Sequence, residues 1–394
     1  MHSVEGPFDA LAEQLGAPWR PRPRPTTWRS FRCQCARPVF FGNSLCLSCG
    51  SPLGYEPHLE RVAPLRAGER AGTWKLDGEL ISDRLYRRCA NFETAAGCNW
   101  LVPDDEADQH AGLCAACRLN RTIPDQNDPR NREAWHRIEV AKRRLVSALL
   151  ALGLPVASRD TEDPAQGLAF EFLRGAPDAP PVTTGHANGV ITLNVEEADD
   201  ARRETIRRAL REPYRTLLGH LRHEVGHYYW DRLVGRSDWL EPFRNVFGDE
   251  RAAYAEALRA HYEQGPPTDW SLRHVSAYAS AHPWEDWSET WAHYLHMVDV
   301  MDTALSFGLD AENLEFHVDP FTPAELWRPD DAGASAFLSF VNAWVELTGV
   351  FNELTRSMGQ PDLYPFVLPH AAVRKLQFVH LVVNAAARQR PAIR

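Results

Sequence analysis

Eight cysteines, all between residues 33 and 117, constrain the fold of this chain more than any other feature of its sequence. They fall into two sets of four: Cys33, Cys35, Cys46 and Cys49, then Cys89, Cys98, Cys114 and Cys117. Each set ends in C-x-x-C, a turn that delivers two thiolates to one tetrahedral zinc ion. We therefore predict two closed, structural zinc sites, which hold together a segment whose own core is too small to fold alone.

Alternatives to two regular four-cysteine sites stay open. Disulfides would use the same cysteines, but they require an oxidising compartment. The zinc ions could also bridge the two sets. The C-x-C pair of Cys33 and Cys35 is tighter than the usual turn, which makes the first site less regular. His110 is a further candidate ligand, although four thiolates complete each site without it.

Length and charge narrow the class of protein. A chain of 394 residues with 44% hydrophobic and 24% charged residues is typical of a soluble protein of two or three domains. The net charge of −10 argues against sequence-independent nucleic-acid binding over the whole surface. There is no run of about 18 apolar residues and no apolar stretch typical of a signal peptide. We expect a cytoplasmic protein with no membrane partner.

Composition divides the chain into three parts. Residues 1–28 end in alternating proline and arginine, which predicts a disordered or extended arm. Residues 29–122 hold all the cysteines and are predicted to form a zinc-ribbon domain. Residues 123–394 are predicted to form one further domain.

The pattern of apolar residues in the last part predicts an α+β fold that is mainly helical, with a small sheet. A helix is expected from about residue 131, followed by strands at "LAFEFL" and "GVITLNVEEA". From about residue 198 the chain is expected to be mostly helical. Residues 333–390 are expected to form further helices, with a proline-rich break between them.

The stretch "RHEVGHYYW" carries an H-E-x-x-H motif within an expected helix over residues 213–233. Helical spacing places His223 and His227 one turn apart on one face, where both imidazoles can bind one zinc ion. Glu224 lies beside them, placed to take a proton from a water molecule that the metal activates. The alternative is a polar helix face with no metal. The longer motif with a third histidine is absent, because Trp230 and Leu233 stand at its positions.

A third ligand must therefore come from elsewhere in the chain. A helix that begins at Pro283 would carry Glu285 and Glu289 four residues apart on one face. Glu285 is the candidate ligand, and Glu289 can accept the N–H of a liganding histidine and fix its tautomer.

Competing candidates for the third ligand are Asp249, Glu250 and His293. The segment "GDERAAYAEAL" is typical of an N-capped helix, with Asp249 as the cap and Glu250 in the first turn.

These two segments together resemble the gluzincin metallopeptidases, in which E-x-x-x-[DE] follows H-E-x-x-H on a second helix. "EDWSE" matches that pattern with Glu285 as the implied ligand and Glu289 as its support. The segment also resembles the catalytic end of anthrax lethal factor, in which a tyrosine precedes the ligand glutamate by seven residues. The resemblance implies that Tyr278 donates its O–H to the developing oxyanion.

A closer resemblance covers roughly residues 30–385. The ribbon ending "CNWLVP…C..CRLNRTIPD", together with "FGDERAAYAEAL" and the two motif segments, is similar to a family of zinc-binding metallopeptidases with an N-terminal zinc ribbon. This resemblance implies nothing about the substrate.

The expected function is a zinc-dependent peptidase with one catalytic and two structural Zn²⁺ ions, acting on a peptide or protein. The ribbon would serve structure or targeting, through contact with a protein or a nucleic acid. In gluzincin-like folds a strand such as "GVITLNVEEA" is an edge strand, and an extended peptide could add to it. The alternative is a non-catalytic binding or regulatory protein with a structural metal site. Glu224 favours the enzyme, since a structural site needs no general base.

Overall fold

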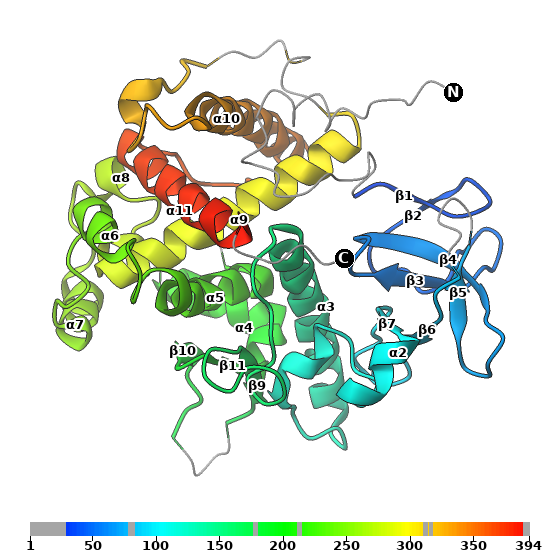
Figure 1. Cartoon of the computed structure of the whole chain (residues 1–394). Helices are drawn as coiled ribbons and strands as arrows, with labels where there is room; N and C mark the ends of the chain where they lie inside the picture. The colour runs from blue at the N-terminus through cyan, green and yellow to red at the C-terminus, as the bar shows by residue number, and fades with distance from the viewer. Residues whose placement is uncertain are drawn as a thin grey trace. The chain divides into compact units, whose positions relative to one another are not determined.

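The computed structural model describes residues 29–77, 83–175, 180–210, 215–309, 314 and 318–388. The predicted arm over residues 1–28 lies outside them. The described chain forms two compact units. The ribbon unit comprises residues 29–151 and 155–205, and the helical unit comprises residues 152–154 and 206–388. The first unit contains the zinc ribbon and small sheets and the second is built from helices, so the fold is α+β and mainly helical, as predicted (Figure 1).

Short strands dominate the first half of the ribbon unit. β1 (Phe31–Arg32) and β2 (Pro38–Val39) pair antiparallel. Five further strands form an antiparallel sheet in sequence order: β3 (Leu53–Glu56), β4 (Arg61–Ala67), β5 (Trp74–Leu76), β6 (Tyr86–Arg88) and β7 (Leu101–Pro103). Short helices follow: α2 (Asp104–Ala107), η2 (Asp108–His110) and η3 (Cys117–Leu119).

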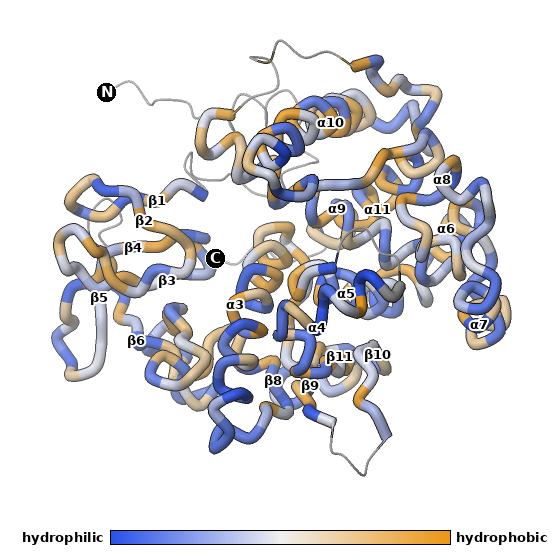
Figure 2. The backbone as a smooth tube through the Cα atoms, turned by 180° about the vertical axis from the view of Figure 1, so that it is seen from behind, coloured by the Kyte–Doolittle hydropathy of each residue, from blue (hydrophilic) through white to orange (hydrophobic). Residues whose placement is uncertain are grey.

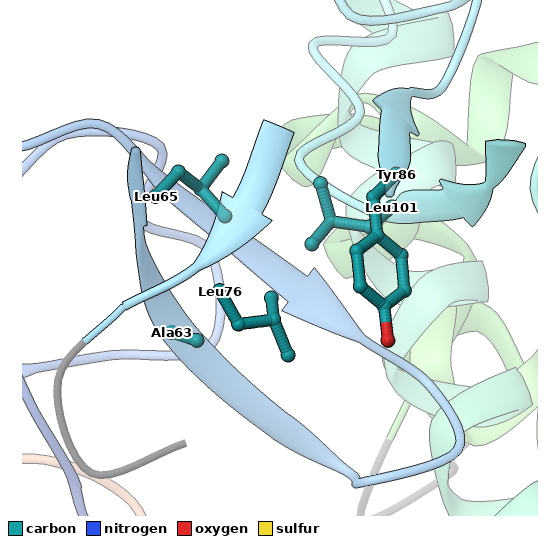
Figure 3. Close-up of a cluster of buried hydrophobic side chains, with 5 residues drawn as sticks. All are labelled: Ala63, Leu65, Leu76, Tyr86 and Leu101. Carbon is teal, nitrogen blue, oxygen red and sulfur yellow. The ribbon is translucent and has the colours of Figure 1, made fainter. Parts of the chain in front are cut away.

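One face of the five-stranded sheet carries a small apolar cluster. Ala63 and Leu65 alternate along β4 and therefore point to the same face, where Leu76, Tyr86 and Leu101 join them (Figure 3). All five side chains are buried, and burial of each large one stabilises the folded state by about 1.5–3 kcal/mol. A cluster of this size cannot hold a sheet of such short strands alone, which is consistent with the need for additional cross-links.

The helix expected from about residue 131 is present as α3 (Pro129–Ala151). It begins where the Asp128 carboxylate accepts the N–H of Arg130 at 2.8 Å. It ends just before Gly153, which adopts a positive φ of 70°.

A four-stranded sheet in the ribbon unit has the order β10-β11-β9-β8. Its strands are β8 (Asn120–Thr122), β9 (Ala169–Leu173), β10 (Gly185–Ala187) and β11 (Val190–Asn194). β9 and β11 lie in the two segments predicted as strands. The rest of "GVITLNVEEA" forms a short helix, η4 (Val195–Ala198), because the Asn194 side chain accepts the N–H of Glu196. The prediction of an edge strand is wrong, because β11 pairs with β10 on one side and β9 on the other.

The chain passes from the ribbon unit to the helical unit within α4 (Asp200–Leu210). The helical unit then contains α5 (Leu217–Leu233), α6 (Leu240–Phe247), α7 (Tyr254–Gln264), α8 (Trp270–Arg273), η5 (Tyr278–Ser280), α9 (Pro283–Ser306), η7 (Pro323–Glu325), α10 (Ala334–Ser357) and α11 (His370–Arg388). The further helices expected over residues 333–390, with a break between them, are present as α10 and α11. α9 runs through the middle of this unit and packs against both α5 and α11 (Figure 1).

Two predicted helix starts differ from the structure. α5 begins at Leu217 and not at residue 213, because Thr216 is extended and its hydroxyl caps the helix by accepting the N–H of Gly219 at 3.0 Å. Pro213 lies outside the described residues. α7 begins at Tyr254, and the Asp249 carboxylate does not cap it, since it accepts the N–H of Arg251 instead.

α10 is, among the described residues, long and apolar enough to cross a membrane. Half of its most apolar stretch is buried inside the protein, and a buried core helix meets the same criterion. Hydrophobic and hydrophilic positions alternate along it (Figure 2). Its sequence is therefore weak evidence for a membrane.

Candidate metal centre

α5 presents the two motif histidines on one buried face. His223 and His227 are one helical turn apart, and their Nε2 atoms lie 3.2 Å from each other. Both side chains are buried. The helix therefore offers two imidazole nitrogens to a single point.

α9 brings the glutamates to that point because it approaches α5 closely. Gly226, between the histidines, faces Ser288, and a Cβ added at Gly226 would lie 3.0 Å from the Ser288 Cα. The indole N–H of Trp287 donates to the Gly226 carbonyl at 2.8 Å. A side chain at position 226 would press on the Ser288 backbone and require it to shift, so this glycine favours the close approach of the two helices that carry the ligands.

The candidate ligand Glu285 lies against both histidines. Its Oε2 atom is 3.0 Å from the Nε2 of His223 and 3.6 Å from the Nε2 of His227. Tetrahedral zinc with bonds of about 2.0–2.2 Å separates its ligand atoms by about 3.3–3.6 Å, so the three distances, 3.0, 3.2 and 3.6 Å, are within about 0.3 Å of those around one zinc ion. Glu285 is 1% exposed, and Oε2 has no hydrogen-bond donor among the described residues. A buried oxygen with no donor is the atom that a metal would satisfy.

Charge is balanced within this group. Burial opposes ionisation of Glu285, but contact with His223 and His227 holds the pKa of its carboxyl well below the ordinary value. Burial likewise opposes a charged His223, and contact with Glu285 and Glu289 raises its pKa well above the ordinary value. Without a metal ion, the two carboxylates are therefore ionised and a protonated His223 is their cationic partner, a place that a metal cation would take.

Glu289 occupies the supporting position that the spacing predicted. It accepts the Nδ1–H of His223 at 2.7 Å through Oε1 and the hydroxyl of Ser276 at 2.5 Å through Oε2. Burial would raise the pKa of Glu289, but the His223 contact lowers it to about 2. The ionised carboxylate fixes the His223 tautomer with Nε2 directed at the candidate metal position.

Glu224, the predicted base, is buried beside His223 on α5. Its Oε2 atom has no hydrogen-bond partner among the described residues. A buried carboxylate oxygen without a partner is costly, and such a group suggests a role that a reactant completes.

Tyr278 lies in η5, with its ring 5.9 Å from that of His223. Burial and the nearby charge of Glu285 raise the pKa of its hydroxyl. The O–H therefore keeps its proton at neutral pH and is available as a donor.

The competing candidates for the third ligand point elsewhere. Glu250 is held by Arg244 in two hydrogen bonds, and Asp249 is held in the same way by Arg251. The Nδ1 atom of His293 lies 2.5 Å from the Tyr364 hydroxyl. None of the three belongs to the group of ligand atoms formed by His223, His227 and Glu285.

Two contacts escaped the sequence analysis. The Tyr254 hydroxyl in α7 donates to Glu285 Oε1 at 2.6 Å, and Ser276 donates to Glu289. Nothing in the local sequence pairs α7 with α9, because the contact depends on how the helices fold together. The position of Ser276, two residues before the candidate Tyr278, was the one weak indication in the sequence that it lies near the site.

Each predicted set of cysteines gathers at one point, and no bridging between the sets occurs. Within each set the four sulfurs lie within 4.8 Å of one another. Pairs of Sγ atoms are 3.5 Å (Cys33 and Cys49), 3.8 Å (Cys35 and Cys46) and 3.6 Å (Cys98 and Cys114) apart. Zn–S bonds of about 2.3 Å in a tetrahedron give about 3.8 Å. All eight cysteines are free thiols, and His110 is not in either group.

The C-x-C departure is accommodated by a tight backbone turn. Ala36 adopts a positive φ of 63°, its N–H donates to the Cys33 carbonyl at 2.8 Å, and the Cys33 N–H donates to the Arg37 carbonyl. Cys35 therefore reaches the other three sulfurs despite its spacing.

Comparison with known proteins agrees with this arrangement. Residues 131–382 match the family described as "putative zinc-binding metallo-peptidase", and residues 30–128 match a zinc-ribbon domain. Uncharacterized proteins of Mycobacterium bovis and Mycobacterium tuberculosis are 45% identical over 361 residues, covering 91% of this chain and 96% of each relative. No solved structure matches. The chain therefore belongs to this zinc-binding metallopeptidase family and carries an N-terminal zinc-ribbon domain.

Proposed function

We propose that this protein is a zinc-dependent peptidase of the gluzincin type, in which His223, His227 and Glu285 hold the catalytic zinc ion. One observation carries the proposal: three ligand atoms converge at separations suited to zinc, directly beside the buried and unpartnered oxygen of Glu224. A structural metal site needs no buried base next to it, which favours an enzyme over a binding protein.

Zinc bound by these residues would activate a water molecule and polarise the scissile carbonyl. Glu224 takes the proton of the attacking water and passes it to the leaving amine. Tyr278 donates its O–H to the oxyanion that develops on the carbonyl oxygen. Glu289, itself held by Ser276, keeps His223 in the tautomer that binds the metal.

Each cysteine set holds one structural zinc ion in this proposal, which gives three zinc ions per chain. Four thiolates fill the tetrahedron and leave no position for a substrate, so chemistry is confined to the helical unit. The ribbon contributes structure or targeting, and the substrate is a peptide or protein.

Glu224→Gln tests the proposal, because glutamine keeps the shape of the side chain and cannot accept the proton. The variant should keep three zinc ions and an unchanged melting temperature, and should lose peptide hydrolysis by at least ~10²–10⁴-fold. Glu263→Gln, which changes an exposed glutamate on α7, is the matched control and should keep full activity.

Because no substrate is assigned, cleavage is first sought in a broad peptide library with chelator controls. The cellular proteome is then compared between cells with the wild type and cells with Glu224→Gln. Peptides generated only by the wild type identify the substrate. If both proteins behave alike in the library and in cells, the protein is a binding or regulatory protein with a structural metal site.

A further inference from the structure

We propose that Tyr254 is a positioning residue of the metal centre, which restricts Glu285 to one oxygen for the metal and ties the docking of α7 to metal binding. This inference rests on the proposed function only in its assignment of His223, His227 and Glu285 as ligands.

The first step is the unequal use of the two Glu285 oxygens. Oε1 accepts the Tyr254 O–H at 2.6 Å, whereas Oε2 faces both histidines and has no donor among the described residues. A hydrogen bond to an ionised carboxylate is of the strong, charge-assisted kind. Tyr254 therefore fixes the rotation of this carboxylate, with one oxygen engaged and the other directed at the metal position.

The second step concerns coordination number. A carboxylate that is free to rotate can bind a metal through both oxygens. A second oxygen from Glu285 would take the position that an attacking water requires in a site with three protein ligands. By occupying Oε1, the Tyr254 hydroxyl keeps Glu285 a ligand through Oε2 alone and leaves the fourth position open.

The third step concerns the helix that carries Tyr254. None of the eleven residues of α7 is buried. Tyr254 stands at its first turn and is 37% exposed, and its ring lies 5.2 Å from His282 and 5.7 Å from Trp284. Farther along α7, the rings of His261 and Tyr262 lie 5.8 Å and 6.5 Å from that of Tyr278. A helix with so little buried apolar surface opens at a small free-energy cost, so one strong hydrogen bond at its start contributes a substantial share of its docking.

The fourth step is thermodynamic reciprocity. If the Tyr254 hydroxyl strengthens metal binding by some factor, bound metal must strengthen the docking of α7 by the same factor. Hydrogen-bond partners of metal ligands typically change metal affinity by about 10–100-fold. Metal binding should therefore lower the equilibrium population of opened α7 by a similar factor.

The test is Tyr254→Phe in the full chain, with zinc at both cysteine sites. Zinc is removed from the helical site with a mild chelator, and its affinity on return is measured by competition with a chromogenic chelator. We expect about 10–100-fold weaker binding. Hydrogen exchange of residues 254–264 should slow by a similar factor when zinc returns to the wild type, and should hardly change in the variant.

A third readout reports coordination directly. Cobalt placed in the helical site alone has visible absorption bands that depend on the number of ligands. Tyr254→Phe should change these bands, because Glu285 gains a second oxygen for the metal. A tyrosine that only packs would leave the bands, the affinity and the exchange unaltered, since phenylalanine keeps the ring.

Two control variants make the result specific. Tyr262→Phe removes a hydroxyl from the same helix two turns later, on a side chain that is 59% exposed and packs on Tyr278, and it should leave zinc affinity unchanged. Glu289→Gln alters the partner of the other ligand, His223, and should weaken zinc binding by about 10–100-fold.

The outcomes separate this inference from the proposed function. Suppose that the wild type binds zinc at the helical site, and that Glu289→Gln weakens this binding but Tyr254→Phe does not. The inference is then wrong and the proposed function stands. The inference is also wrong if zinc leaves the exchange of α7 unchanged in the wild type. If the wild type binds only two zinc ions, both are wrong.

Discussion

The cysteine sites and the histidine–glutamate site hold their ligands by different means. Most of the cysteines lie in turns between very short strands, and their sulfurs chiefly contact one another and nearby groups. The Cys114 N–H donates to the Cys89 sulfur at 3.4 Å, and the Cys117 thiol, at the start of η3, donates to the buried Glu139 at 3.9 Å. The histidines and Glu285 project from two long helices that pack through Gly226, Trp287 and a stack of Tyr229 on Trp291. One kind of site is held by its own ligands, and the other by the surrounding fold.

This difference indicates what metal contributes in each place. Without zinc, four thiolates would repel one another, and the small apolar cluster of the five-stranded sheet could not hold the turns in place. In the helical unit, the ligands are already oriented by Glu289 and Tyr254, and the helices pack independently of them. Metal should therefore determine folding in the ribbon unit and reactivity in the helical unit.

Cys98→Ser should give the largest effect, because a hydroxyl is a poor zinc ligand and Cys98 is fully buried. Binding of a structural zinc ion is worth on the order of 10 kcal/mol, most of which folds the segment around it. The variant should lose one zinc ion, and the amides of β3–β7 should exchange freely with solvent. Metal analysis and hydrogen exchange check both. A variant with three zinc ions and protected strands would show that the sheet holds itself.

Glu285→Ala should also remove one zinc ion, but without unfolding. Both cysteine zinc ions stay, and circular dichroism at 222 nm should be unchanged, since α5 and α9 are held by packing. Glu250→Ala is the matched control. It removes a partly buried glutamate that pairs with Arg244, and it should keep all three zinc ions. Loss of zinc from Glu250→Ala, with zinc retained by Glu285→Ala, would contradict the ligand assignment.

The same contrast explains what the sequence could predict. Helical spacing brings the H-E-x-x-H histidines together, and each cysteine set ends in a C-x-x-C turn, so these patterns indicate which atoms can meet, although bridging between the cysteine sets stayed open. Glu285 and Glu289 could be predicted because their own spacing is helical and matches a known pattern. The Tyr254 contact was not, because it joins residues 31 positions apart through a packing of helices that no local pattern encodes.

The errors have equally local causes. The start of α5 was placed before Thr216 because the apolar spacing continues backwards, whereas the Thr216 hydroxyl ends that regularity by capping the helix. Asp249 was taken as a cap of α7, but a nearby Arg251 takes its carboxylate. β11 was placed at an edge on the resemblance to gluzincin-like folds, and its partner β10, which is only three residues long, carries almost no strand pattern that could have corrected this.

Tyr278→Phe should affect the reaction alone. The ring stays beside His223 and His261, so zinc content and stability should match the wild type. Loss of one oxyanion donor typically lowers kcat by about 10²–10³-fold. Steady-state kinetics on a peptide from the library check this, with KM expected to change little. An unchanged kcat would assign Tyr278 to packing, in contrast to Glu224.

The smallest predicted effect is a pH dependence of stability that belongs to the helical unit. Buried histidines occur, among the described residues, only in the helical unit, and His380 in α11 lies farthest from any proposed ligand in sequence. Its ring nitrogens lie 3.0 Å from the Tyr294 hydroxyl and 2.9 Å from the Asn384 amide. Burial, together with the charge of Arg388, lowers the pKa of His380 to about 3.

Because this folded-state pKa lies below the unfolded value of about 6.5, the unfolded chain binds the extra proton as the pH falls. The contribution of His380 to stability is therefore fully present above about pH 6.5 and declines below it, by about 1.4 kcal/mol between pH 7.5 and 5.5. His380→Gln removes the titrating group, so its free energy of unfolding should fall less over this range than that of the wild type. Urea denaturation followed at 222 nm, where helices dominate the signal, measures the difference. Equal declines in both proteins would show that the pKa of His380 is the same in the folded and unfolded states. Acid would then destabilise the helical unit through other groups.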